Sequence, residues 1–541
     1  MFWVGFAVVM GCHSSTSTEN VNEPDPVWHG DLQPWMVQNC TNCHRENGSA
    51  PFSFESLEVV QQLAPVMLES MKSGSMPPWL PSDECAQLEE VRSVDVSEIA
   101  RFERWIELGF PIGDADVEPA VLSVVQDIEA DYIAQLPPGF VPDTSAGDEY
   151  RCFPLELNFE TETFIRETQV KPGNSLVHHV LIYALDPSQK ESVLAADAAS
   201  ERPGYKCFGA PFPDGGGADY SQGFPAQIGA WVPGIEPAVL PDGAAFRVKP
   251  GSLIVMQVHY SALGGEPVED TTSYHIRVSS DPPAQLAQTR PLAILELDIP
   301  PGASSVSVSD RFTNYFDRPA EIYNLATHMH LLGKSQQATI TRSDGSEECA
   351  LYIPEWDFGW QQSYEPKEPM ILEPGESIHL DCTYDNSQAN QPLVNGTQQA
   401  PQHVEWGDGT LDEMCLLYVT FMEPYRPLNP EGSSACHGVE ECVADCGDSL
   451  DCLMQCESVE FGCLTCALGS FLDCGISQCL VEGAMAESCM RHCYARSIML
   501  GAPIGACMDT ECPSEYSALM ECAEPAINGA QCEAQFASCG L

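Results

Sequence analysis

The sequence predicts a multidomain protein: a small all-α N-terminal domain, two all-β sandwiches and an α-helical, disulfide-rich C-terminal domain. A chain of 541 residues is too long for one hydrophobic core. Its hydrophobic content of 44% and its nine Trp indicate folded domains rather than a disordered chain. The cysteines are unevenly spread, because 16 of the 25 fall between Cys436 and Cys539. Such density implies an oxidising compartment.

The charge balance excludes one class of partner. The chain carries 79 acidic and 23 basic residues, for a formal net charge of −56. Such a surface repels phosphate backbones and anionic lipid headgroups, so we expect no nucleic-acid partner. The plainest interpretation of the charge is solubility.

The N-terminus has the pattern of an exported protein. The apolar run Phe2–Met10 ends at Cys12 and is followed by a polar stretch. This resembles a bacterial lipoprotein signal in which Cys12 is acylated, although no Lys or Arg precedes Arg45; an ordinary signal or a buried segment is the alternative. No later run reaches the ~18 apolar residues that span a bilayer. We therefore expect a signal and polar tether over 1–30, and a periplasmic, outer-membrane or cell-surface lipoprotein, or a secreted protein, that meets the membrane only through a lipid anchor.

Residues 31–113 carry helical signals. Asp95 and Glu98 have the spacing of a capping box, and the apolar residues that follow recur on one helical face until Gly109. The acidic residues 114–123 are expected to link two domains.

The segment also holds the haem-attachment signature Cys40-Thr41-Asn42-Cys43-His44. The two thiols would bind haem c covalently, and His44 would ligate the iron. Met76 is the best second axial ligand, because a thioether suits an electron carrier; Met67 and Met71 are rivals whose helical spacing favours core packing. A chance motif within a disulfide network is the alternative. In these features residues 31–113 resemble small class I cytochrome c domains.

From 124 to 428 the pattern changes to short β-rich runs punctuated by Pro and Gly, which predicts two sandwiches over 124–285 and 286–428. The expected strands are Ser252–Tyr260, Ser273–Val278, Leu292–Ile299, Ile371–Tyr384 and Met414–Phe421.

Three histidine clusters and one methionine stand beside these strands: His178-His179, His259, His328-Met329-His330 and Met414. Residues i and i+2 of a strand share a face, so His328 and His330 can chelate one ion. His178 and His179 can do so only if the backbone bends or bulges. Imidazoles with a thioether suit copper. Each piece alone is weak, since a lone His pair is usually a surface feature and a lone Met usually core.

Together the clusters resemble the copper type II, ascorbate-dependent monooxygenases, the family of dopamine β-hydroxylase and peptidylglycine α-hydroxylating monooxygenase. The motifs that carry the resemblance are Val177-His178-His179-Val180-Leu181, Gln257-Val258-His259-Tyr260, His328-Met329-His330-Leu331-Leu332-Gly333-Lys334 and Asp412-Glu413-Met414-Cys415 with Tyr418. Asp148-Glu149-Tyr150-Arg151-Cys152 and the stretch 356–384 are similar to family sequence as well. The resemblance covers about 300 residues in the family's order.

The resemblance implies two jelly-roll-like β-sandwiches with one copper on each, facing a cleft. His178, His179 and His259 would hold the electron-transfer copper, and His328, His330 and Met414 the copper that binds O₂. Tyr418 would contact substrate or serve packing. Peptidylglycine enzymes carry an Arg and an Asn where this chain has Ala326 and Leu416, which argues against a peptidylglycine substrate.

The remaining cysteines are interpreted as disulfides. By the resemblance, Cys382 pairs with Cys415 and Cys152 with Cys207, while Cys85 and Cys349 stay unassigned. In the segment 430–541, three pairs have i, i+4 spacing and so share a helical face: Cys442/Cys446, Cys452/Cys456 and Cys489/Cys493. Disulfide-stapled helices are expected there; copper storage or delivery by these thiols is the alternative.

Two functions compete. The first is a dicopper monooxygenase that hydroxylates a C–H bond of a small organic substrate with O₂. Its electrons would come from ascorbate, as in the family, or through the haem from a periplasmic donor. The second is a non-catalytic exported copper or haem protein for electron transfer or copper binding. A blue-copper site would need a Cys ligand, and the bridge to Cys382 would remove Cys415 from that role.

Overall fold

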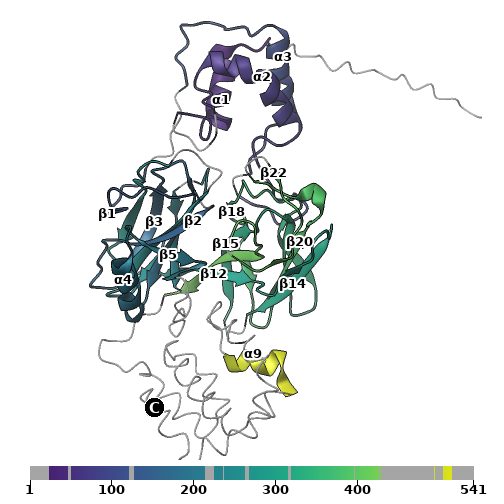
Figure 1. Ribbon diagram of the computed structural model, residues 1–541. Helices are drawn as coiled ribbons and strands as arrows, with labels where there is room; N and C mark the ends of the chain where they lie inside the picture. Colours follow the sequence, from purple (N-terminus) through teal and green to yellow (C-terminus); the bar gives the residue numbers. More distant parts are fainter. Residues whose placement is uncertain are drawn as a thin grey trace, which may run out of the picture. The chain divides into compact units, whose positions relative to one another are not determined.

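The computed structural model describes residues 24–46, 50, 52–89, 91–120, 127–145, 147–213, 225–235, 237–261, 267–314, 318–394, 397–407, 409–425, 427, 493 and 504–514. The chain forms two compact units (Figure 1). The helical unit comprises Met1–Pro77 and Arg92–Ser123, and the β-rich unit comprises Pro78–Val91 and Val124–Leu541. The expected 31–113 domain is thus interrupted, because Pro78–Val91 belongs to the β-rich unit.

The helical unit contains the helices α1 (Gln33–Asn39), α2 (Leu57–Lys72) and α3 (Val96–Glu107), after a short turn η1 (Trp28–Leu32). The predicted capping box is present, since Asp95 and Glu98 each accept from the other's backbone N–H. Gly109 follows α3 with a φ of +76°, a conformation that favours glycine. The predicted start and stop of this helix are therefore confirmed.

The polar tether expected over residues 1–30 is wrong at its end. Trp28 is 4% exposed and stacks on Trp105 with ring centroids 5.7 Å apart. The apolar surface of this indole outweighs its polar neighbours, so the chain from about residue 24 packs into the helical core. At the other end of the unit, Gln33 and Ala120 exchange two hydrogen bonds, so residues expected only to link domains are held here as well.

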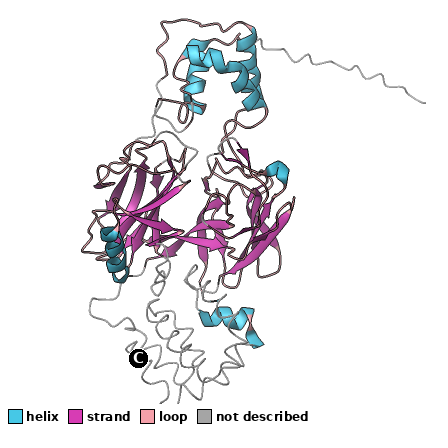
Figure 2. Ribbon diagram, in the orientation of Figure 1, coloured by secondary structure: helices cyan, strands magenta, loops and turns pink. Residues whose placement is uncertain are grey.

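The β-rich unit begins with a first lobe, residues 127–284, built from two facing sheets (Figure 2). Its strands are β1 (Tyr132–Gln135), β2 (Glu149–Pro154), β3 (Thr163–Lys171), β4 (Val177–Leu185), β5 (Tyr205–Phe208), β6 (Ala210–Pro213), β7 (Ala226–Trp231), β8 (Ala238–Val239), β9 (Ala244–Val248), β10 (Leu253–Tyr260) and β11 (Ser273–Ser279). Every residue of β10 is buried, because one face meets the core between the sheets and the other meets a layer that includes α4 (Lys190–Ala199). The predicted strands at 252–260 and 273–278 are confirmed.

The second lobe, residues 285–425, is a second sandwich. Its strands are β12 (Gln285–Ala293), β13 (Asp298–Ile299), β14 (Val306–Thr313), β15 (Ala320–His328), β16 (Gly333–Thr341), β17 (Glu347–Ile353), β18 (Ser363–Tyr364), β19 (Met370–Leu372), β20 (Ser377–Tyr384), β21 (Leu393–Val394), β22 (Thr397–Gln398), β23 (Val404–Glu405) and β24 (Leu416–Pro424). Strands β14, β20, β16 and β17 form one sheet, and β12, β24 and β15 form the other.

Three predicted strands of the second lobe have different limits. The run 292–299 divides between the end of β12 and the short β13, and the run 371–384 divides between β19 and β20. A backbone hydrogen bond from Glu376 to Glu373 forms the turn in the second case. β24 begins at Leu416, so Met414 precedes the strand.

The two lobes share hydrogen-bonded strands. β12 pairs along its length with β24 of the second lobe and also meets β9 and β7 of the first lobe. Figure 1 shows β12 between the two lobes. Because these pairings join both lobes into one sheet, the ends of β4, β10 and β15 are held in one frame.

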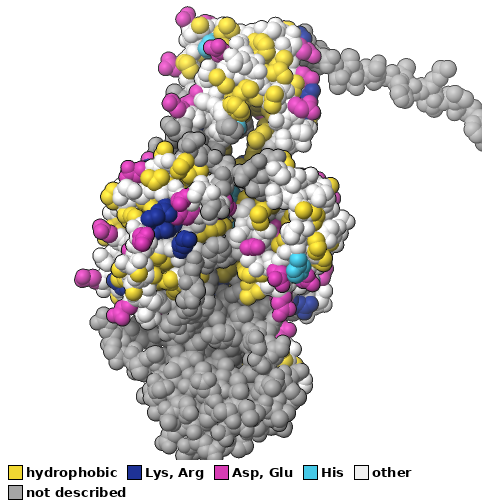
Figure 3. Space-filling view, in the orientation of Figure 1, with side chains coloured by type: hydrophobic (Ala, Val, Ile, Leu, Met, Phe, Trp, Pro, Cys, Tyr) yellow, Lys and Arg dark blue, Asp and Glu magenta, His cyan; other side chains and the backbone are white. Residues whose placement is uncertain are grey.

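Of the predicted C-terminal domain, the described residues show helix α9 (Ile504–Glu511) and a disulfide between Cys493 and Cys507. The i, i+4 pairs at 442/446 and 452/456, and Cys489, lie outside the described residues. Among the described helices, none has the length and apolarity to cross a membrane. Asp and Glu are spread over the face seen in Figure 3, where Lys and Arg gather mainly on the first lobe.

Candidate metal centre

Three histidines meet where β4 and β10 lie side by side. In the register of these strands His259 lies opposite His179, and Tyr260 lies opposite Val177. His178 is therefore the extra residue of a bulge, which is the backbone irregularity that the sequence required. The ligand nitrogens of the three side chains lie within 4.8 Å of one another.

Hydrogen bonds orient these rings. His259 donates through Nε2 to Asp148 Oδ2 at 3.0 Å, because a carboxylate only accepts, and its Nδ1 therefore carries a lone pair. That Nδ1 lies 3.4 Å from Nδ1 of His179. Two nitrogens about 2.0–2.1 Å from one ion at a roughly tetrahedral angle are separated by about this distance. Tyr150 stacks on His259 with centroids 4.1 Å apart and fixes the ring plane.

The environment of these imidazoles fits a metal ion. Nδ1 of His178 is buried and has no hydrogen-bond partner among the described residues. An unsatisfied buried nitrogen is costly, and a bound cation would satisfy it. Burial, with the neighbouring His259, lowers the pKa of His178 to about 4, and the same causes hold the pKa of His179 well below its usual value. Both rings are therefore neutral at pH 7, as metal binding requires.

The second cluster lies at the end of β15. His328 is the last residue of the strand and His330 lies beyond it, so the expectation that both sit in one strand is wrong. Met329 between them is fully buried in the second lobe's core, and the chain turns directly afterwards. The two rings still meet, with centroids 5.1 Å apart.

Both rings of this cluster are held through Nδ1. His328 Nδ1 lies 2.7 Å from Gln361 Oε1, and His330 Nδ1 lies 3.0 Å from the carbonyl oxygen of Asp412. A proton on each Nδ1 leaves each Nε2 as the ligand atom. Burial lowers the pKa of His328 to about 4 and, with His328 nearby, that of His330 to about 3. These rings too are neutral at pH 7.

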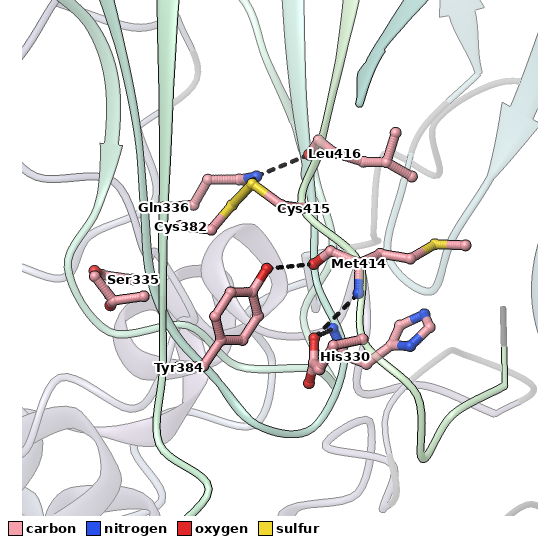
Figure 4. Close-up of a disulfide and its surroundings, with 10 residues drawn as sticks. His330, Ser335, Gln336, Cys382, Tyr384, Met414, Cys415 and Leu416 are labelled. Atoms are coloured by element: carbon pink, nitrogen blue, oxygen red, sulfur yellow. Dashed lines mark hydrogen bonds between the residues drawn. A yellow bond between two sulfur atoms is a disulfide. The ribbon is translucent and has the colours of Figure 1, made fainter. Parts of the chain in front are cut away.

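Met414 is tied to the same loop by a buried carboxylate. Glu413 is fully buried, and its side chain accepts hydrogen bonds from the backbone N–H groups of His330 at 2.9 Å, Leu332 at 2.6 Å and Met414 at 3.3 Å. In Figure 4 the side chains of His330 and Met414 extend toward the same side. One carboxylate thus places both ligand-bearing segments.

Two further contacts fix Met414. Tyr384 donates its hydroxyl to the carbonyl oxygen of Met414 at 2.8 Å, and the adjacent Cys415 is bonded to Cys382 of β20 (Figure 4). Tyr418 packs against the small apolar cluster that contains Met414, so its ring lies beside the predicted thioether ligand.

The two clusters adjoin. The rings of His179 and His328 have centroids 6.3 Å apart. Phe358 stacks on His178 at 5.0 Å and meets His330 edge-on at 6.1 Å. The five imidazoles therefore form one continuous group, where the sequence led us to expect two centres facing each other across a cleft.

The predicted haem ligands lie in the helical unit. Cys40 and Cys43 are the free thiols among the described residues, and burial, together with Cys43, raises the pKa of Cys40 to about 12. His44 stacks on Phe54 at 4.1 Å, and Met76 is 42% exposed. Met67 and Met71 are buried in the helical core, as their spacing indicated. Two unpaired thiols beside a histidine fit covalent haem attachment.

Sequence reasoning also missed contacts. The pairs Cys382–Cys415 and Cys152–Cys207 are confirmed, and Cys85 pairs with Cys349, which elimination alone could have suggested. Asp148, Gln361 and Glu413 had no assigned role. Asp148 and Glu413 stood inside quoted motifs, but their hydrogen bonds join segments 81 or more residues apart, so no local pattern could reveal them.

Comparison with known proteins gives an independent indication. Residues 299–437 match the model of the family "Copper type II ascorbate-dependent monooxygenase, C-terminal domain". The chain is 24% identical over 291 residues to peptidyl-glycine alpha-amidating monooxygenase A of Xenopus laevis, covering 52% of this chain and 27% of that protein. It is 22% identical to DBH-like monooxygenase protein 2 of Mus musculus (51% and 41%) and 23% identical to DBH-like monooxygenase protein 1 of Gallus gallus (57% and 48%).

The chain spans less than half the length of each of these three relatives. The matched family domain includes His328, His330 and Met414, and the copper type of that domain agrees with the donor set at the end of β15. These likenesses support the family that the motifs predicted, the copper type II ascorbate-dependent monooxygenases, and with it an enzyme of the dicopper monooxygenase class.

Proposed function

We propose that the β-rich unit hydroxylates a C–H bond of a small organic substrate with O₂ in a copper-dependent reaction. The observation that carries this proposal is the convergence of five neutral, buried imidazoles from two lobes, next to Met414. In the balanced reaction, R–H, O₂, two electrons and two protons give R–OH and water.

The ligand sets follow the hydrogen bonds. His178, His179 and His259 would hold one copper through nitrogens that include the facing Nδ1 atoms. His328 and His330 would hold the other through Nε2, together with the Met414 thioether. Copper at these positions supplies single electrons and the activation of O₂. The protein fixes each tautomer and keeps every ligand ring uncharged.

The strand register indicates what kind of substrate fits. Ala326 of β15 lies opposite Tyr418 of β24, and His328 lies opposite Leu416. Ala326 and Leu416 stand where peptidylglycine enzymes carry an Arg and an Asn that help to hold a carboxylate. With apolar side chains at both positions, we propose a substrate that lacks a carboxylate there, with the Tyr418 ring as a contact.

The helical unit would carry electrons. Cys40 and Cys43 would attach haem c, with His44 and Met76 as axial ligands, and the haem would pass electrons from ascorbate or a periplasmic donor. Attachment outside the cytoplasm fits the disulfides of the β-rich unit. We propose export, with Cys12 as a lipid anchor.

The test is oxygen consumption by the copper-loaded full chain with amine, phenolic and aliphatic compounds, read together with ¹⁸O incorporation into product. We expect uptake of ¹⁸O₂ to label one product hydroxyl per turnover. His330→Ala should abolish labelling, and His379→Ala, on β20 away from the clusters, should retain it. Copper that is bound and reducible, yet never labels any product, would instead favour a non-catalytic electron-transfer protein.

A further inference from the structure

One aspartate contacts groups from both lobes. Asp148 directly precedes β2 in the first lobe, and its Oδ2 accepts the hydrogen bond from Nε2 of His259 at 3.0 Å. The hydroxyl of Thr410, from the second lobe, donates to the same oxygen. The Asp148 side chain is 15% exposed, so water competes little for this carboxylate.

Thr410 belongs to a loop that also holds the other centre. Within residues 409–413, the Asp412 carbonyl accepts from Nδ1 of His330 at 3.0 Å, and the Gly409 N–H donates to the Asp412 side chain at 3.1 Å. Glu413 ends the loop and accepts from the backbone N–H of His330. A single five-residue segment thus contacts the support of His259 and the support of His330.

We propose that Asp148 is a positioning residue shared by the two copper centres, and that its hydrogen bond to Thr410 couples metal binding at one centre to occupancy of the other. The proposal rests on the proposed function in that it requires copper at both histidine clusters. It adds a connection between them that does not use a ligand atom.

The coupling has a simple physical cause. The ring of His259 presents Nδ1 to His179 only while Asp148 holds Nε2, and Asp148 is held by Thr410. When copper orders His330, the Asp412 carbonyl and its loop are ordered too, and Thr410 is placed to hold Asp148. Linkage then requires the effect to be reciprocal, so copper at the three-histidine centre must favour copper at His328 and His330.

The experiment is a double-mutant cycle on the full chain. The copper affinity of the three-histidine centre is measured by competition with a chelator, and that centre is identified by its loss in His178→Ala. Four chains are compared: wild type, Thr410→Val, His330→Ala and the double variant. Thr420→Val is the matched control, because its hydroxyl also bonds across the chain, to Thr289 at 2.9 Å.

We expect His330→Ala to weaken copper at the three-histidine centre several-fold in the wild type and to have no effect once Thr410 is valine. Thr410→Val alone should weaken that centre about tenfold, the lower range for loss of an outer-shell partner. Thr420→Val should leave its affinity unchanged. If Thr410→Val does not fold, Asp148→Asn replaces it, with the same loss of coupling expected.

Two results would overturn the proposal, and they are distinguishable. If wild type binds two copper ions and His330→Ala weakens the three-histidine centre equally in the presence of threonine or valine at 410, the shared-aspartate coupling is wrong and the dicopper assignment stands. If wild type binds no copper at either cluster, the coupling and the proposed function fail together.

Discussion

His179 of the first lobe and His328 of the second lobe lie with their ring centroids 6.3 Å apart. They come from β4 and β15, whose positions depend on the shared sheet through β12 and β24. Two metal-binding clusters on separate sandwiches thereby become neighbours, and each can be tested by removing ligands on its own side.

Removal of one cluster should cost one copper ion. His178→Ala takes away the bulged ligand of the three-histidine centre, so bound copper should fall from two ions per chain to one. His379→Ala on β20 is the matched control and should keep both. Metal analysis after dialysis measures the count, and two ions remaining in His178→Ala would contradict the ligand assignment.

Copper removal should also lower thermal stability. The histidine clusters exist in the folded chain alone, so copper binds the native state preferentially and stabilises it by mass action. At free copper 100-fold above the dissociation constant, the gain is about 2.7 kcal/mol per site. Calorimetry before and after chelation should show the fall in melting temperature for wild type and about half of it for His178→Ala. An unchanged melting temperature would argue against preformed sites.

Glu413 should make the stability of the copper-free protein depend on pH. Burial raises its pKa to about 8 from an ordinary 4.5, although hydrogen bonds from backbone N–H groups oppose the rise. Between these values the folded chain keeps a proton that the unfolded chain has released, so wild-type stability falls as pH rises through this window. Glu413→Gln has no such proton, and its stability relative to wild type should rise by a few kcal/mol over the window.

Urea unfolding at several pH values measures this difference, and Glu376→Gln supplies the control. Burial raises the pKa of Glu376, but hydrogen bonds from Arg342 and from backbone N–H groups outweigh burial and lower it. Its variant should therefore show a flat difference from wild type above pH 4.5. Parallel pH profiles for wild type and Glu413→Gln would show that Glu413 keeps its ordinary pKa.

The disulfide next to Met414 should matter to copper more than a disulfide elsewhere in the lobe. Cys382→Ala with Cys415→Ala should cost about 2–4 kcal/mol and reduce sulfur ligation of copper, because Cys415 follows the thioether ligand directly. Cys85→Ala with Cys349→Ala should also destabilise but leave the copper–sulfur signal in X-ray absorption unchanged. Equal copper–sulfur signals in both double variants would remove the bracing role.

Much of this site could be predicted from residue types and order, because imidazole and thioether donors and the haem-attachment motif are readable one residue at a time. The bulge at His178 was predictable as a need, since adjacent residues of a regular strand face opposite ways. The position of His330 was not, because the chain leaves β15 at His328 when Glu413, 83 residues away, accepts its N–H. The closeness of the two clusters and the docking of Pro78–Val91 on the second lobe likewise depend on long-range pairing.

The haem assignment can be tested by its axial ligand. Covalent haem on the peptide that contains Cys40 and Cys43 should appear by mass spectrometry, and Met76→Leu should lower the reduction potential, because a thioether ligand raises it. Met67→Leu, which changes a buried core residue, should leave the potential unchanged. A potential that moves with Met67 and not with Met76 would reassign the ligand.

The most direct test of the two-centre account is a crystal structure of the copper-loaded full chain with anomalous scattering measured at the copper edge. The account predicts two peaks, one among His178, His179 and His259 and one bounded by Nε2 of His328, Nε2 of His330 and the Met414 sulfur. A map with no peak at either position, or with copper bound only at other residues, would contradict it.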